Sequence, residues 1–166
     1  MLTYNFSLVF DKDTEEQIRE YAIKINPALN TQFDLNAESM PHITIIKFNT
    51  TEELNSATIE KIENLCPKEL YVTFSGLTLL PSHNAGTWIE ISVIKTNNLI
   101  KLQKQAELLL PNAQILNKIC DGYRPHITLS KTVDVNNLTI SNLDSAILRK
   151  KNIRVQANLS LAGNHF

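Results

Sequence analysis

The sequence predicts an α+β fold with a largely antiparallel sheet. Apolar and polar residues alternate at both ends of the chain, over residues 2–10 and 153–161, which is the period of a strand with one buried face. Between these ends, segments with helical spacing are mixed with further strand-like runs. Two of those runs are separated by the turn-forming residues 82–86, as in a hairpin. Helices mixed with hairpin strands indicate the α+β class.

The first half of the chain is expected to contain two strand-helix units. Each helix is predicted to open with a capping box, in which a capping side chain is followed three residues later by Glu. The expected elements are the strand 2–10, a helix opened by Asp13 and Glu16 that runs to Leu29 and is closed around Pro27 and Asn30, a polar stretch over 30–40, a strand over 41–48, and a helix opened by Thr50 and Glu53 that stops at Pro67.

The second half is expected to begin with the hairpin and to end in a strand. A third amphipathic helix follows the hairpin, and Pro ends it because proline cannot continue a helix. The expected elements are strands over 70–80 and 88–96, a helix over 99–109 ended by Pro111, a turn at Asp121 and Gly122, a strand over 126–131, a weaker helical stretch over 141–150, and the strand 153–161.

Composition places the chain among folded globular proteins. Its 166 residues are 43% hydrophobic and 20% charged, and no linker-like stretch divides them, so residues 1–166 are predicted to form a single domain. A net charge of −1 excludes the basic footprint of a protein that binds duplex DNA. The absence of a signal-like or membrane-spanning run predicts a cytoplasmic protein without a membrane partner, and we expect a monomer.

The most informative feature is a repeated heptapeptide. Residues 41–47 read PHITIIK and residues 125–131 read PHITLSK, and the two are identical at five of seven positions. The chain has only 4 histidines, so chance is a poor explanation of this agreement. On a strand, residues two apart share a face, so each copy presents an imidazole beside a hydroxyl: His42 with Thr44, and His126 with Thr128.

Paired imidazoles and hydroxyls suit phosphodiester chemistry. Imidazoles titrate near neutral pH, so one can accept a proton while the other donates one. Hydroxyls beside them can donate hydrogen bonds to the non-bridging oxygens of a phosphate. We therefore expect His42 and His126 to be catalytic and Thr44 and Thr128 to bind phosphate. Zinc is not expected, because a site normally needs three or four protein ligands and the sequence offers no further His or Cys cluster.

On these two motifs, the sequence resembles the two-histidine (2H) phosphoesterase superfamily, which includes RNA 2',3'-cyclic phosphodiesterases formerly described as 2',5' RNA ligases. The resemblance implies two pseudo-symmetric lobes, each an antiparallel sheet flanked by helices, with the active-site cleft between them. It also implies catalysis without a metal or other cofactor. Implied substrates are small nucleotides or RNA ends with 2',3'-cyclic phosphates, and 2',5'-linked or cyclic oligonucleotides.

Applied to this chain, the resemblance predicts a hydrolase in which one histidine activates water and the other protonates the departing ribose oxygen. Which histidine is the base stays open. A second function class also stays open, a nucleotide-binding sensor module that uses the same cleft without turnover.

Five other residues are candidates for contacts with the substrate. Tyr123 and Arg124 precede the second motif and could stack on a base or contact a phosphate, with an equally good structural explanation. Lys47 and Lys131 lie five residues after their histidines, so each would face away from the phosphate unless a bulge reverses the strand parity. Trp88, the only tryptophan, is predicted to be a core residue, with a stacking wall as the alternative.

Overall fold

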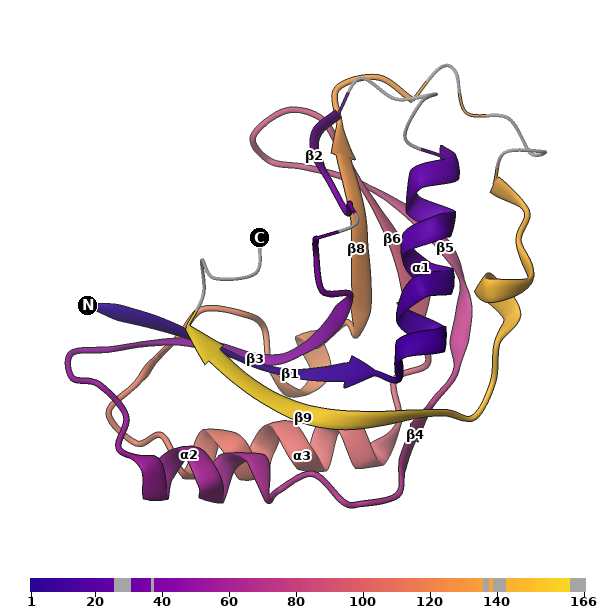
Figure 1. Ribbon diagram of the computed structural model, residues 1–166. Helices are drawn as coiled ribbons and strands as arrows, with labels where there is room; N and C mark the ends of the chain where they lie inside the picture. The colour runs from indigo at the N-terminus through magenta and orange to yellow at the C-terminus, as the bar shows by residue number, and fades with distance from the viewer. Residues whose placement is uncertain (26–30, 37, 136–137, 139–142, 162–166) are drawn as a thin grey trace.

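The computed structural model describes residues 1–25, 31–36, 38–135, 138 and 143–161, and it confirms the α+β class (Figure 1). Two antiparallel sheets meet at a steep angle, and helices lie on the outer face of each. The elements in chain order are β1 (Leu2–Phe10), α1 (Lys12–Ile25), β2 (Thr31–Asp34), β3 (His42–Thr50), α2 (Ser56–Glu63), β4 (Leu70–Val72), β5 (Phe74–Pro81), β6 (Thr87–Val93), α3 (Asn97–Leu108), β7 (Gln114–Ile115), the 3₁₀ turn η2 (Cys120–Gly122), β8 (His126–Thr132), the 3₁₀ turn η3 (Ala146–Arg149) and β9 (Ile153–Leu161).

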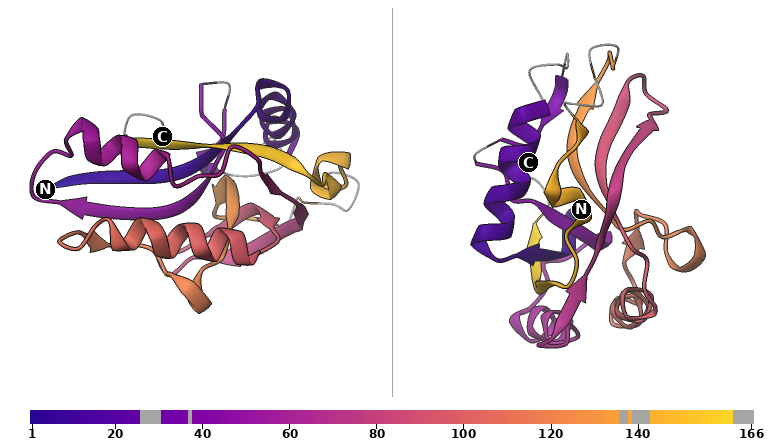
Figure 2. Two further views of the ribbon diagram at one scale, coloured as in Figure 1. Left: turned by 90° about the horizontal axis from the view of Figure 1, so that it is seen from below. Right: turned by 90° about the vertical axis from the view of Figure 1, so that its right-hand side faces the viewer.

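The first sheet has the strand order β4-β9-β1-β3-β7, and the second has the order β2-β8-β6-β5. Helices α2 and α3 pack on the first sheet, against β9 and β3, whereas α1 packs against β8 of the second (Figure 2). The apolar side chains that face these helices form the core, and Ile43, Ile45 and Ile127 are among those with no exposed surface. Each sheet therefore keeps its opposite face for polar residues.

The sheets are interleaved in the sequence. β2 comes from the first half of the chain but joins the second sheet, and β7 and β9 come from the second half but join the first. No single point in the sequence, the hairpin included, therefore separates the two lobes. Hydrophobic period identifies a strand but carries no information about which sheet it joins.

Both terminal strands are confirmed, and so are the hairpin of β5 and β6 and the helix before Pro111. The starts of the first two helices are corrected. The side chain of Asp11, not Asp13, accepts the capping hydrogen bond from the Thr14 amide at 2.8 Å. Likewise Asn55, not Thr50, caps the second helix through Thr58, because Thr50 still belongs to β3. Leu29 and the rest of residues 26–30 lie outside the described part of the chain.

Three further differences concern short elements. The predicted strand 70–80 is two strands that belong to different sheets, because the chain crosses at Thr73. The polar stretch contains the edge strand β2, whose four residues are too few and too polar to show a clear period. Of the predicted helical stretch 141–150, Leu143 is helical and Ala146–Arg149 form η3, while residues 141–142 lie outside the described part of the chain. Among the described residues, no helix is long and apolar enough to cross a membrane.

Candidate functional site

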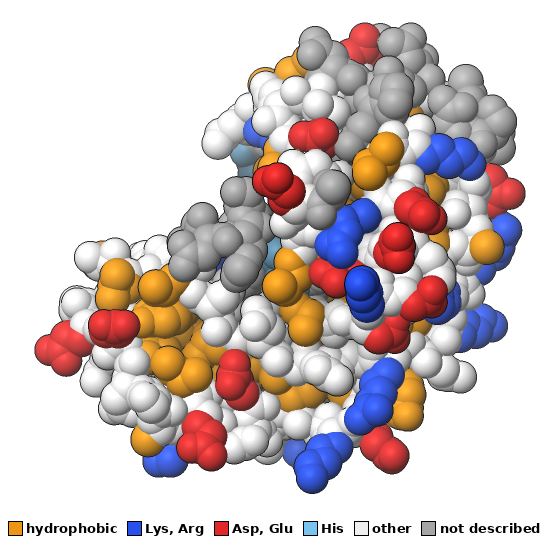
Figure 3. Space-filling view, in the orientation of Figure 1, with side chains coloured by type: hydrophobic (Ala, Val, Ile, Leu, Met, Phe, Trp, Pro, Cys, Tyr) orange, Lys and Arg blue, Asp and Glu red, His pale blue; other side chains and the backbone are white. Residues whose placement is uncertain are grey.

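The two motifs lie on β3 and β8, one central strand from each sheet, and these strands contact each other where the sheets meet. The molecule is hollowed between the two lobes, and histidine side chains are visible in this hollow (Figure 3). The fold thus brings together two copies of a motif that stand 84 residues apart in the sequence, 42 against 126.

Both motif strands carry a β-bulge at the same place. Phe6 and Ser7 of β1 pair with Ile46 and Thr44, so the register skips Ile45. In the second sheet Ile89 and Glu90 pair with Ser130 and Thr128, and the register skips Leu129. Each bulge inserts one unpaired residue, which reverses the alternation of side chains beyond it. The lysine five positions after each histidine therefore returns to the face that carries the histidine and the threonine. Lys47 and Lys131 therefore lie on the same strand faces as His42 and His126.

The carbonyl oxygens of the bulged residues, Ile45 and Leu129, accept hydrogen bonds from groups outside β3 and β8. The buried Gln103 amide of α3 donates to Ile45 O at 2.8 Å, and Asn117 donates to the same oxygen at 3.2 Å. In the second sheet the Leu35 amide donates to Leu129 O at 2.7 Å. A buried carbonyl without a partner is costly, so these contacts stabilise the bulges and with them the direction of the lysines.

Both histidine rings are held in the same way. His42 Nδ1 lies 2.9 Å from Met40 O, and His126 Nδ1 lies 2.7 Å from Arg124 O. In each motif the accepting carbonyl belongs to the residue before the proline. A carbonyl only accepts hydrogen bonds, so Nδ1 carries a proton in both rings. Nε2 is therefore the atom at which each ring exchanges a proton.

The two Nε2 atoms have different partners. His42 Nε2 lies 3.2 Å from Asn5 Nδ2, and His126 Nε2 lies 3.4 Å from Glu90 Oε1. The Glu90 side chain is only 3% exposed, and its other carboxylate oxygen accepts a hydrogen bond from Arg124. One histidine thus has a neutral amide beside it, and the other has a buried carboxylate.

A cavity of about 180 Å³ opens between the sheets beside these residues. His42, Thr44 and Lys47 contribute to its wall from the first sheet, and Thr128 and Phe33 from the second. His126 stands on the face of β8 that carries Thr128, two residues before it, outside the set that lines this cavity. Three of the four predicted site residues and one lysine therefore border one space.

Tyr123 and Arg124 are placed differently from each other. Tyr123 is 4% exposed, and its hydroxyl donates to Thr44 O at 3.0 Å. This hydrogen bond connects the segment before the second motif to β3, the strand of the first motif. This burial leaves the ring almost no surface on which a base could stack. Arg124 pairs with Glu90 and keeps 43% of its side chain exposed, so a contact between Arg124 and substrate stays a prediction.

The tryptophan is not a core residue. Trp88 is only half-buried, and it lies opposite Lys131 in the register of β6 and β8. The Lys131 ammonium stands 5.2 Å from the centre of the Trp88 ring, and Phe33 lies 6.5 Å from that ring. The three side chains form an aromatic and cationic row across β2, β8 and β6.

Sequence reasoning missed Asn5 and Glu90. Both look like ordinary residues within strands, and only the pairing of β1 with β3 and of β6 with β8 brings them to the histidines. A carboxylate within the strand run WIEISV, whose other residues are uncharged, was the one available signal, because a buried acid needs a partner.

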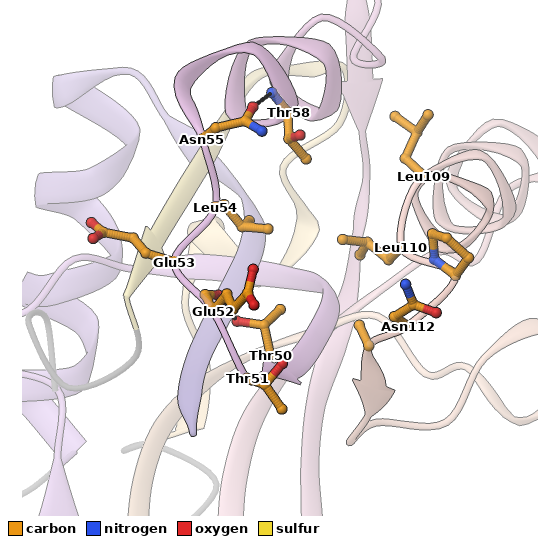
Figure 4. Close-up of a pocket in the computed structure, with 12 residues that line it drawn as sticks. Thr50, Thr51, Glu52, Glu53, Leu54, Asn55, Thr58, Leu109, Leu110 and Asn112 are labelled. Atoms are coloured by element: carbon orange, nitrogen blue, oxygen red, sulfur yellow. Dashed lines mark hydrogen bonds between the residues drawn. The ribbon is translucent and has the colours of Figure 1, made fainter.

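A larger cavity, of about 350 Å³, lies away from the motifs (Figure 4). It is bordered by residues 50–55 and Thr58 on one side and by residues 109–113 on the other. It contains no histidine, and the Asn55 amide that points along it already caps α2. Within the described ranges, no group of three or more His, Cys, Asp or Glu side chains is gathered as a metal site would require.

The fold and the paired site define the class to which the protein belongs. Two antiparallel sheets that each present a His-x-Thr strand are the arrangement expected of two-histidine phosphoesterases. The sequence model of the 2'-5' RNA ligase superfamily matches residues 10–157, so the chain belongs to this superfamily.

Solved structures agree with this fold. Escherichia coli LigT, in a crystal structure complexed with 3'-AMP, is similar over 96% of this chain and 87% of its own, with 14% identity and a TM-score of 0.51. A structure described as a phosphoesterase is similar over 97% of this chain and 88% of its own, with 15% identity and a TM-score of 0.53. None of the curated proteins matches the chain significantly.

Proposed function

We propose that the protein is a metal-independent phosphodiesterase that hydrolyses 2',3'-cyclic phosphates or 2',5'-linked or cyclic oligonucleotide phosphodiesters. The observation that carries this proposal is the matched pair of motif strands, each of which presents an imidazole and a threonine on one face where the two sheets meet. His42 and His126 would transfer protons, and Thr44 and Thr128 would hold the phosphate oxygens. The 3'-AMP bound to LigT supports a small nucleotide or an RNA end as substrate.

The cavity wall supports a polar ligand. Asn5 is 3% exposed and borders the cavity, and among the described residues its Oδ1 is the one buried side-chain oxygen or nitrogen without a hydrogen-bond partner. Such an atom calls for a donor from a bound molecule. A ribose hydroxyl or the attacking water could supply that donor next to His42.

Lys47 supports an anionic ligand. Its position on the cavity wall beside His42 and Thr44 brings a positive charge toward the space where the phosphate would lie. Charge-assisted hydrogen bonds to phosphate are stronger than neutral ones, so Lys47 would contribute to binding of the ground state. A net charge of −1 for the whole chain fits a short substrate better than a long nucleic acid.

The test is phosphorus NMR of the purified protein in excess EDTA. The panel contains 2',3'-cyclic nucleotides, 2',5'-linked dinucleotides and cyclic oligonucleotides, and the H42A/H126A double variant is the control. We expect turnover by the wild type alone, and the substrate hydrolysed fastest identifies the class of reaction. Turnover that disappears with EDTA would contradict the metal-independent mechanism.

A nucleotide-binding sensor module is the second candidate function. Asn5, Thr44 and Thr128 could hold a nucleotide without any chemistry, and the same panel distinguishes this case. Binding without hydrolysis by the wild type would make His42 and His126 phosphate ligands. The cytoplasmic location and the monomeric state belong to the same proposal, and cell fractionation and light scattering test them.

A further inference from the structure

We infer that Phe33, Lys131 and Trp88 form a subsite for a second nucleotide, so that the preferred substrate is the 3' end of a single-stranded RNA rather than a mononucleotide. This inference rests on the proposed phosphodiesterase function and names the class of its substrate. Phe33 would stack on the base of the terminal nucleoside, and Lys131 would bind the 5' phosphate of that nucleoside. Trp88 would stack on the base before it.

The aromatic and cationic row lies on the same face of the second sheet as Thr128. Phe33 of β2 and Trp88 of β6 are both register partners of Lys131, on the two sides of β8. Trp88 lies two residues from Glu90, the register partner of Thr128, so Trp88 and Thr128 share a face. The row therefore continues the site face along the sheet, next to the threonine that is expected to hold phosphate.

Phe33 connects this row to the cavity of the proposed site. Its side chain borders the same cavity as Thr44 and Thr128, whereas Trp88 lies outside the set that lines it. The two ring centres are 6.5 Å apart, and the ring planes are inclined by 58°. Both side chains are partly exposed. An aromatic surface thus begins in the cavity wall and continues outside the cavity.

The two rings suit two successive bases of a single strand. Every base has a π-face, so proteins bind single strands by stacking successive bases on aromatic side chains, with little dependence on sequence. A mononucleotide whose phosphate lies at Thr128 would reach Phe33 and leave Trp88 without a base. The second ring therefore indicates a second nucleoside.

Lys131 places a positive charge between the two rings. Its ammonium stands 5.2 Å from the centre of the Trp88 ring, a contact that holds the charge in the row without replacing the hydrogen bonds that a phosphate accepts. Lys131 and Thr128 pair with residues two positions apart on β6, which corresponds to about 7 Å along the strand. Successive phosphates of an extended single strand have a similar separation. With the reactive phosphate at Thr128, the next phosphate would therefore reach Lys131.

The row is separate from the packing of the core. The core side of the same strands carries Ile89, Ile91 and Ile127, which have no exposed surface. On the row side, Leu80 of β5 is the next register partner of Trp88 and is 37% exposed. Apolar surface therefore crosses the sheet from β2 to β5 on the face that leads to the cavity, where a stacked base would cover it.

The binding test uses three ligands that grow by one group at a time. They are adenosine 3'-phosphate, adenosine 3',5'-bisphosphate and the dinucleotide ApAp, all of which end in the same 3'-phosphate. We expect each added group to tighten binding in calorimetry, and ApAp to bind at least about tenfold more tightly than adenosine 3'-phosphate. Trp88 is the only tryptophan, so its fluorescence reports on the subsite directly, and ApAp should quench it more than the bisphosphate does.

The variants assign each gain to one side chain. W88L should remove the gain from the bisphosphate to ApAp, and W88F should restore most of it. K131Q should remove the gain from adenosine 3'-phosphate to the bisphosphate and flatten the salt dependence of ApAp binding by about one phosphate contact. F33L should weaken all three ligands. Y71L, at a half-exposed ring of β4, and K104Q, at an exposed lysine of α3, are the matched controls and should change none of these affinities.

The outcomes separate the two proposals when hydrolysis of the 2',3'-cyclic phosphates of adenosine and of ApA is compared. We expect a higher kcat/KM for the dinucleotide in the wild type. If neither is hydrolysed but ApAp still binds more tightly and quenches Trp88, the proposed hydrolysis of cyclic phosphates fails and the subsite stands. If ApAp binds no better than adenosine 3'-phosphate, or if W88F and K131Q show that the gains do not depend on these side chains, the subsite is overturned whatever the activity. Urea unfolding verifies that each variant is folded, and the wild-type fluorescence and K131Q decide the question if W88L is not.

Discussion

The contacts at Nδ1 define what each histidine can do. Met40 O and Arg124 O hold the two rings in one tautomer, so neither ring has to reorient between accepting and donating a proton. Fixed rings of this kind lower the entropic cost of reaching the transition state. The chemistry then depends on the two Nε2 atoms, and their different partners distinguish the two rings.

Removing either imidazole should slow the reaction strongly. We expect H42A and H126A each to lower kcat by about 10²- to 10⁴-fold, the range for a general acid or base, with little change in the thermal midpoint. T44V and T128V should cost about 2–4 kcal/mol of transition-state binding if each hydroxyl acts as an oxyanion donor. Steady-state kinetics on the best substrate measures both effects. H83A, at the exposed hairpin turn, is the control, and wild-type rates in H42A would remove that ring from the mechanism.

Lys47 should affect binding more than chemistry. A lysine at the cavity wall attracts the phosphate in the ground state and in the transition state alike, so K47M should raise KM about tenfold and change kcat less. K24M, at the exposed end of α1, is the control for a lost surface charge. An unchanged KM in K47M would show that the bulge does not bring this lysine to the substrate.

At the scale of the elements, the terminal strands and the motif strands show what a sequence can reveal, and the corrected starts of the first two helices show what it can miss. The alternation in residues 2–10 and 153–161 predicted both strands because half-buried strands have a period of two. The repeat predicted His42, Thr44, His126 and Thr128 by residue type alone. The bulges were not predictable, because a bulge depends on the register of a neighbouring strand. The positions of Asn5 and Glu90 beside the histidines were not predictable for the same reason, although the carboxylate of Glu90 within a strand hinted at a buried partner.

The first helix offers a test of its corrected start. Asp11 accepts from the Thr14 amide, and this hydrogen bond is the largest cause that lowers the pKa of the Asp11 carboxyl. D11A should therefore lower the free energy of unfolding by about 1 kcal/mol near neutral pH. Because the pKa is lowered in the folded state, the contribution is present above the unfolded value near 4 and is lost as the pH falls below it. Urea unfolding at two pH values measures this, and D13A should change stability less.

The first bulge depends on one buried amide. Q103L should leave Cys120 N without its acceptor and weaken the hold on Ile45 O, at a cost of about 1–3 kcal/mol. Urea unfolding measures the loss, with Q32L on the exposed face of β2 as the matched control. Equal stability of Q103L and the wild type would mean that the bulge needs no support from α3.

At the scale of the whole molecule, buried tyrosines connect distant parts of the chain. Tyr21 of α1 donates to Leu143 O at 2.8 Å, and Tyr123 donates to Thr44 O, so each hydroxyl joins segments that are far apart in the sequence. Burial raises the pKa of Tyr123, and burial together with the charge of Asp144 raises the pKa of Tyr21 to about 12. Both rings stay neutral in the folded protein at pH values where they ionise in the unfolded chain.

Stability should therefore fall in alkaline solution. A raised pKa means that the folded state holds its proton more tightly, so the contribution is complete below the unfolded pKa near 10 and is lost as the pH rises toward 12. Tyr21 alone should lower the free energy of unfolding by about 1 kcal/mol between pH 9 and pH 11. Y21F should flatten this slope in urea unfolding, whereas Y71F, at a half-exposed ring, should not. A slope unchanged in Y21F would contradict the assignment.

The interleaving of the two sheets has a consequence for the integrity of the chain. A break in the turn over residues 82–86 would leave β1, β3 and β4 of one sheet and β2 and β5 of the other on the first fragment, with β6, β7, β8 and β9 on the second. Each fragment would carry one of the two motif histidines and unpaired strand edges from both sheets. Neither fragment could fold as a lobe by itself, because each supplies the strands with which the other must pair. The two pieces would recover a working site only by fragment complementation, so the activity of the split chain would report their reassembly.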